Sequence, residues 1–193
     1  LNWKGFIENT QIIEPIKESG KDFREEGCDY LIITHPDFQS EITELADWKN
    51  TKGYLTKVVD TTVAGTTSSE IEEYIQEAYD TWEPRPSYLL LVGDNEFVPP
   101  SSSGTGTDLY YVTVDGSDYI PDMFHGRIPA DTPQEAEIIV QKILTYEQNP
   151  PSLSSFYENF TVAAYFQDDE KNGYETRRFV RTSEEIRDYL MTI

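Results

Sequence analysis

The chain has 193 residues, of which 37% are hydrophobic and 13% aromatic, a composition typical of folded proteins. Its 36 acidic and 15 basic residues give a formal charge of −21, which disfavours binding to nucleic acid or to anionic membranes. The length allows one domain and the start of another, and no apolar run is long enough for a membrane span. The single cysteine, Cys28, excludes an internal disulfide and a cysteine-based zinc site.

Apolar runs and helical patterns alternate in the first half of the chain. Residues 28–34 (CDYLIIT), 54–59 (YLTKVV) and 88–92 (YLLLV) have the length and the side chains of strands. Between them, residues 42–49 show helical spacing, and a capping box at residues 67–70 opens a second helix. This βαβαβ order predicts an α/β fold with a parallel sheet and helices on both faces.

The pattern changes after the third predicted strand. Residues 98–108 are rich in proline, serine and glycine, which predicts a loop. The apolar runs at 109–114 and 123–128 surround a polar turn and favour a hairpin. A second capping box at residues 132–135 opens another helix, which ends before Asn149 and the double proline at 150–151.

This double proline is the strongest boundary signal in the chain. We expect a lead-in arm or linker at 1–27, a first α/β subdomain with the acidic hairpin at 28–151, and the truncated beginning of a second subdomain at 152–193. In the last part, residues 160–166 (FTVAAYF) predict a strand, and a helix follows from Thr182. One strand and one helix cannot bury their apolar faces alone, so more chain is expected to complete this subdomain.

Acidic residues gather in the predicted hairpin. Asp115, Asp118 and Asp122 are three or four residues apart, and Asp108 precedes them. Such carboxylates can converge on one cation with backbone carbonyls, and an all-oxygen shell selects calcium over zinc. The alternative is an ordinary acidic turn, because Asp and Gly are common turn residues. Asp94 follows the third strand, where α/β sheets place their sites, but it could equally cap the turn.

The residues suited to nucleophilic catalysis are Cys28, His35 and His125. Cys28 begins a predicted buried strand, where cysteine is usually a core residue. His35 precedes a proline at the end of that strand, and no cysteine follows His125. We therefore predict no pair of catalytic nucleophile and general base from these residues.

Several segments in a fixed order resemble the gingipain family of cysteine peptidases. They are LLLVGD at residues 89–94, a proline-containing loop, TDLYYVTVDGSDYIPDMFHGRI at residues 107–128, and a capped helix ending in Tyr-Glu. The similarity begins near Asp29 and includes the helix around Trp48. It implies the first, caspase-like or Rossmann-like subdomain of a gingipain-type catalytic domain, followed by the start of a larger caspase-like subdomain.

The resemblance also implies a function for the full-length protein. It would be a secreted or cell-surface cysteine endopeptidase that hydrolyses peptide bonds in peptide or protein substrates. The catalytic His and Cys would lie after Ile193, so this chain would hold no catalytic residue and would be inactive without the remainder of the catalytic domain. His125 would align with the variable position of Phe-x-Gly-Arg. The family residue that selects a basic substrate side chain would lie near residues 167–178. This stretch holds Arg177 and Arg178, which disfavours a preference for arginine or lysine and leaves the substrate specificity open.

Structural Ca²⁺ is a further implication of the resemblance. Asp94 would bind one ion, and Asp115, Asp118, Asp122 and the carbonyl of Ile120 would bind another. Asp115 stands where the family has an apolar residue, so its side chain need not be a ligand.

Two other functions are compatible with parts of the pattern. A gingipain-like domain without its catalytic pair could serve as a calcium-binding module in adhesion or secretion. A nucleotide-binding or receiver-like domain would share the strand order, but the sequence lacks a glycine-rich turn after Thr34.

Overall fold

The computed structural model describes residues 27–101, 106–164 and 178–192. The strands are β1 (Tyr30–Thr34), β2 (Thr56–Asp60), β3 (Tyr88–Val92) and β4 (Phe124–Ile128). The helices are α1 (Gln39–Thr51), α2 (Thr61–Ala64), α3 (Ser68–Thr81), α4 (Pro133–Gln148), α5 (Ser154–Glu158) and α6 (Arg178–Leu190), with 3₁₀ turns η2 (Pro36–Phe38) and η3 (Leu109–Tyr111). The chain divides into two compact units, Leu1–Thr145 and Tyr146–Ile193.

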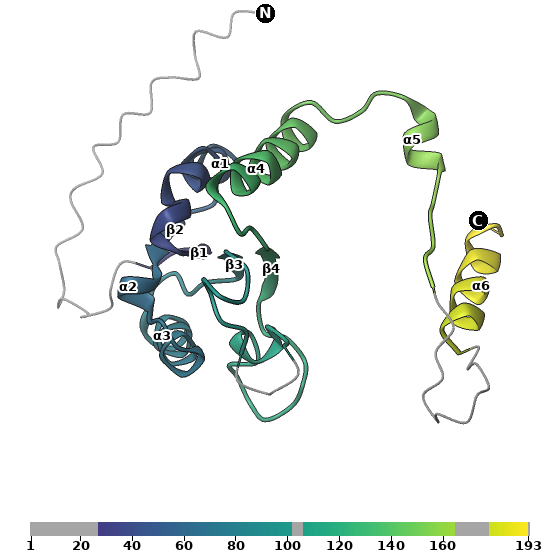
Figure 1. Cartoon of the computed structure of the whole chain (residues 1–193). Coiled ribbons are helices and arrows are strands. Elements are labelled where there is room, and N and C mark those ends of the chain that lie inside the picture. Colours follow the sequence, from purple (N-terminus) through teal and green to yellow (C-terminus); the bar gives the residue numbers. More distant parts are fainter. Residues whose placement is uncertain (1–26, 102–105, 165–177, 193) are drawn as a thin grey trace, which may run out of the picture. The chain divides into compact units, whose positions relative to one another are not determined.

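The first unit contains a four-stranded parallel sheet in the order β2-β1-β3-β4 (Figure 1). Tyr30 of β1 pairs with Thr56 of β2 and with Tyr88 of β3, and Tyr88 pairs with Phe124 of β4. The predicted parallel α/β sheet is therefore confirmed. The strand at residues 88–92 has the predicted bounds, because the segment is wholly apolar and is bounded by proline and glycine.

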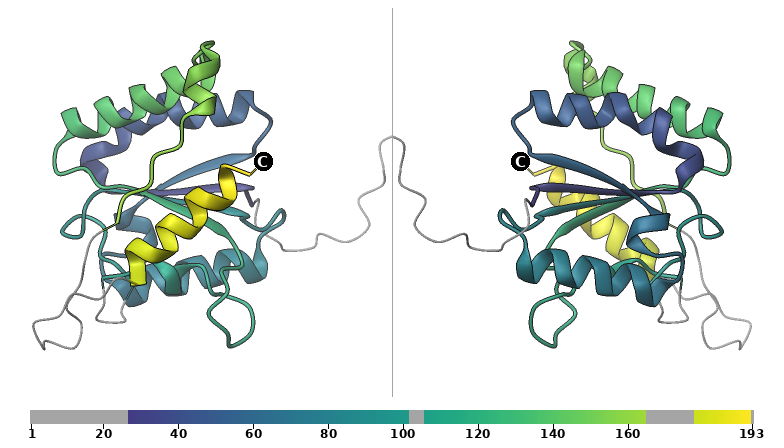
Figure 2. Two further views of the ribbon diagram at one scale, coloured as in Figure 1. Left: turned by 90° about the vertical axis from the view of Figure 1, so that its right-hand side faces the viewer. Right: turned by 90° about the vertical axis from the view of Figure 1, so that its left-hand side faces the viewer.

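Apolar side chains cover both faces of this sheet. Alternate residues of β1 point to opposite faces, so Leu31 and Ile33 pack in one core while Ile32 packs in the other. The first core also contains Ile71, Ile75 and Ala78 of α3, and the second contains Ile42 and Leu45 of α1 with Val140 and Leu144 of α4. Figure 2 shows α1 and α4 on one face of the sheet and α3 on the other. The central strands β1 and β3 are thus buried between helices, as their continuous apolar runs require.

The predicted helix starts are present. The Thr67 side chain accepts a hydrogen bond from the Glu70 amide at 3.3 Å, and the Glu70 carboxylate accepts one from the Thr67 amide at 3.0 Å. At α4 the Thr132 hydroxyl accepts from the Glu135 amide at 3.3 Å, and Glu135 accepts from the Asp131 amide at 2.9 Å. Both boxes satisfy backbone amides that have no partner within the helix.

The predicted hairpin is wrong. Residues 109–111 form the 3₁₀ turn η3, and β4 pairs in parallel with β3 at the edge of the sheet. Tyr111 is fully buried, and its hydroxyl donates to the Pro99 carbonyl at 2.7 Å. The apolar residues of 109–114 therefore anchor a loop against the core, and no strand forms there.

The second unit contains α5 and α6. The predicted helix from Thr182 is present and starts earlier, at Arg178. Residues 160–164 form no strand, and the rest of the predicted strand lies outside the described residues. Phe160 is 64% exposed and Tyr189 is 67% exposed, so this unit leaves large apolar side chains uncovered. In the described part of the chain, no helix has the length and apolar character needed to cross a membrane.

Candidate functional site

The topological switch point of the sheet lies between β1 and β3. The chain leaves β1 toward β2 on one side and returns to β3 on the other. In open α/β sheets, ligands bind at the carboxyl ends of the strands at such a point. His35 follows β1 there, and Gly93 and Asp94 follow β3.

His35 holds the turn after β1. Its Nδ1 accepts a hydrogen bond from the Asp37 amide at 3.3 Å and caps η2. Its ring lies 5.0 Å from the Phe97 ring and 6.0 Å from the Phe38 ring, measured between centroids. These contacts give His35 a packing and capping role.

Asp94 organises a tight turn through its backbone. Its amide donates to the Ala130 carbonyl at 3.1 Å, and its carbonyl accepts from the amides of Phe97 and Val98, each at 2.9 Å. The preceding Gly93 has φ 125°, and a Cβ there would lie 2.8 Å from the Cβ of Phe97. Only glycine suits this position. The backbone amide and carbonyl of Asp94 therefore close the turn after β3.

In the acidic loop, residues 114–122, two carboxylates accept hydrogen bonds from backbone amides of the same loop. Asp122 accepts hydrogen bonds from the amides of Val114 and Asp115 at 2.8 and 2.9 Å. Asp118 accepts from the Ile120 amide at 2.8 Å. The side chain of Ile120 is 69% exposed at the tip of the loop. These bonds stabilise the turns of the loop.

Calcium was expected at this loop and at Asp94. The donor types suit calcium, because they are carboxylate and carbonyl oxygens. However, no three His, Cys, Asp or Glu side chains among the described residues are grouped so that they could hold a metal ion. Asp115, Asp118 and Asp122 do not form a carboxylate cage in this conformation. The calcium site stays a prediction.

The Arg127 side chain donates four hydrogen bonds near the switch point. Its Nε and Nη2 donate to the two oxygens of Asp108 at 2.9 and 2.7 Å. Its Nη1 donates to the carbonyls of Gly93 and Val98 at 2.7 and 2.8 Å. The two side chains are only 12% and 17% exposed. The sequence showed Arg127 within Phe-x-Gly-Arg, but nothing in that motif indicated its partner.

The histidines and the cysteine do not form a catalytic group. Cys28 is fully buried, and its burial raises the pKa of the thiol to about 11. Cys28 precedes β1, whereas His35 lies at the opposite end of that strand. His125 is exposed on β4, two strands away from β1. A thiolate beside an imidazole, which a cysteine peptidase needs, is not formed by these three residues.

A sequence model of Peptidase family C25 matches residues 23–192. The chain belongs to this family. Lys-gingipain W83 of Porphyromonas gingivalis is 31% identical over 142 residues, which are 69% of this chain and 8% of that protein. A solved protease structure superposes with a TM-score of 0.59 at 31% identity, covering 66% of this chain and 30% of that protease.

The fold is shared with a crystal structure of the Arg-specific cysteine proteinase gingipain R, at a TM-score of 0.57 and 23% identity over 66% of this chain and 30% of that one. The resemblance to gingipains is thus confirmed. The chain spans only a small part of the relatives that it matches.

Proposed function

We propose that this chain is the first part of the catalytic domain of a gingipain-like cysteine endopeptidase. The observation that carries the proposal is the match of Peptidase family C25 to residues 23–192, together with the parallel sheet shared with solved gingipain structures. The described residues contribute the scaffold, namely the sheet and the loops at its carboxyl edge. The proposed catalytic His and Cys lie after Ile193.

The chemistry of the described residues agrees with a scaffold in this chain and a catalytic pair outside it. A nucleophilic cysteine must reach its thiolate form beside a base, whereas the raised pKa of Cys28 keeps its thiol protonated at neutral pH. We propose peptide or protein substrates for the full-length protein and a secreted or cell-surface location, both on the strength of its kinship with gingipains. Calcium at the 115–122 loop is part of the same proposal.

The test uses the full-length natural polypeptide that contains this chain. It should cleave a denatured protein substrate such as casein, and iodoacetamide should abolish the cleavage. Cys28→Ala should leave this activity intact, and the 193-residue chain alone should have none. A correctly folded full-length protein without peptidase activity would favour the non-catalytic module. Loss of activity in a folded Cys28→Ala protein would assign the nucleophile to this chain and contradict the proposal.

A further inference from the structure

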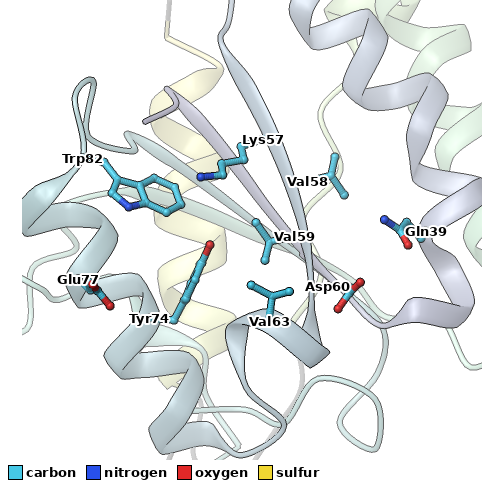
Figure 3. A pocket seen from close by; sticks show the side chains of 9 residues that line it. All are labelled: Gln39, Lys57, Val58, Val59, Asp60, Val63, Tyr74, Glu77 and Trp82. Carbon is cyan, nitrogen blue, oxygen red and sulfur yellow. The ribbon is translucent and has the colours of Figure 1, made fainter. Parts of the chain in front are cut away.

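A groove follows the edge of the sheet at β2 (Figure 3). β2 is the terminal strand of the sheet, and no other described strand pairs with its outer side. The groove has a volume of about 480 Å³. Its lining comes from β2 itself, from α2 and α3, and from Gln39 at the start of α1. An edge strand beside a groove presents backbone amides and carbonyls that can pair with another chain.

The side of the groove toward α3 is apolar and aromatic. Val59 of β2 and Val63 of α2 lie side by side, and Val63 is 66% exposed. The rings of Tyr74 and Trp82 pack edge to face, with centroids 5.8 Å apart. An exposed valine between an open strand and two aromatic rings provides a surface for an apolar or aliphatic side chain.

Lys57 does not protect this edge. Lysine on an edge strand usually discourages pairing, because its charge projects across the strand edge. Here the Lys57 ammonium lies 3.8 Å from the centroid of the Trp82 ring, a cation–π distance. The Lys57 side chain is therefore directed toward Trp82, the residue that follows α3 (Figure 3), and its charge does not project across the outer edge of β2.

The charge of the groove is negative. A second cavity of about 340 Å³ shares Val63, Tyr74 and Glu77 with it and adds Glu70 and Glu73. Asp60 accepts hydrogen bonds from Thr62, and these bonds hold the pKa of its carboxyl below the ordinary value. Among the described residues that line the two cavities, Lys57 is the one basic residue. A chain that pairs with β2 would therefore be selected for positive charge.

We propose that this groove binds an extended basic peptide, which adds to β2 as a fifth strand and places a Lys or Arg side chain against Glu73 and Glu77. Main-chain hydrogen bonds to an edge strand supply affinity, and alternate side chains supply specificity. The aliphatic part of the basic side chain packs on Val63 while its charge reaches the two carboxylates. The proposal does not depend on peptidase activity.

Binding is measured on the 193-residue chain by fluorescence anisotropy. The probe is a fluorescein-labelled, amidated peptide of sequence Ser-Val-Lys-Val-Lys-Val-Ser, and the comparison peptide carries Glu in place of Lys. The basic peptide should bind and the acidic one should not. Two further basic peptides carry N-methyl groups on alternate amides, in complementary positions. Only one of them loses the donors that face β2, so their affinities should differ.

Glu77→Lys should weaken binding of the basic peptide about tenfold, which corresponds to about 1.4 kcal/mol. Glu137→Lys makes the same charge change at an exposed position of α4 and should leave the affinity unchanged. Equal binding of the Lys and Glu peptides would overturn the selection for charge. Equal binding of both N-methylated peptides would overturn strand addition. A dimer that Glu77→Lys dissociates, in a chain that binds no peptide, would assign the groove to a second copy and refute the proposal.

Discussion

Arg127 and Asp108 form a two-pronged ion pair, with nitrogen–oxygen distances of 2.9 and 2.7 Å. The same guanidinium also binds the carbonyls of Gly93 and Val98. One side chain from β4 therefore joins the turn after β3 to the segment that leads into the acidic loop. It also gives both carboxylate oxygens of Asp108 an internal partner.

Arg127→Met should destabilise the first unit by about 3–5 kcal/mol, because a poorly exposed carboxylate would lose its counter-charge and two carbonyls would lose their donor. The free energy of unfolding is measured with urea. Arg85→Met is the matched control: it removes an exposed guanidinium 5.0 Å from the Tyr79 ring and should cost about 1 kcal/mol or less. Equal costs for the two variants would contradict a structural role for the ion pair.

The sequence predicted the centre of the sheet better than its edge. Residues 88–92 are apolar throughout and are bounded by proline and by Gly93, so both the strand and its burial were evident. In β4 the first two residues, Phe124 and His125, are exposed. The segment itself was predicted, at residues 123–128, but its parallel pairing depends on β3, which precedes it by more than thirty residues.

The hydrogen bonds of Arg127 were harder to predict than the helix caps, because they also depend on residues far apart in the sequence. Capping boxes are local, so Thr67 and Glu70 could be paired from their spacing alone. The partners of Arg127 come from two segments, the turn after β3 and the segment that leads into the acidic loop, and only the folded sheet brings them together. Residues 160–164 were predicted as part of a strand from their sequence, but they form none. A strand needs a neighbouring strand as well as a suitable sequence.

Thr67→Ala should destabilise the first unit by about 1 kcal/mol, because it removes the hydroxyl that accepts from the Glu70 amide at the start of α3. Thr43→Ala is the control, since the Thr43 hydroxyl donates back to the Gln39 carbonyl on the exposed side of α1. That change should be neutral or slightly stabilising. Urea unfolding measures both variants, and a Thr43→Ala cost as large as that of Thr67→Ala would show that the cap contributes nothing specific.

Glu70 should make stability depend on pH in the acid range. Hydrogen bonds from the Thr66 amide and from Thr67 hold the pKa of the Glu70 carboxyl below its ordinary value. A carboxyl with a lower pKa in the folded chain stabilises the fold above its unfolded pKa, about 4.3. The stabilisation is lost as the pH falls from there through the folded pKa. Glu70→Gln should therefore lower the melting temperature at pH 7 and flatten its decline below about pH 4. Glu137→Gln, which caps no helix, should leave the curve unchanged.

Calcium should raise the melting temperature of the chain if the 115–122 loop binds it. Ligand at about 100 times its dissociation constant stabilises a folded protein by about 2.7 kcal/mol. Asp118→Asn should remove this response, whereas Asp47→Asn on the exposed side of α1 should retain it. Differential scanning fluorimetry with calcium and with chelator measures the shift. An unchanged melting temperature in the parent chain would refute the site.

The thiol of Cys28 should be unreactive in the folded chain. It is fully buried, and the resulting rise of its pKa to about 11 leaves about one thiolate in ten thousand at pH 7. Since the thiolate is the reactive form, 5,5′-dithiobis(2-nitrobenzoate) should label the native chain at least about a hundredfold more slowly than the chain in urea. Ser40→Cys in a Cys28→Ala background places a thiol at an exposed position of α1 and should react rapidly under native conditions. If native Cys28 instead reacts as fast as this exposed thiol, its burial is transient. Cys28 then becomes a candidate nucleophile, and the proposal that the catalytic cysteine follows Ile193 loses its chemical support.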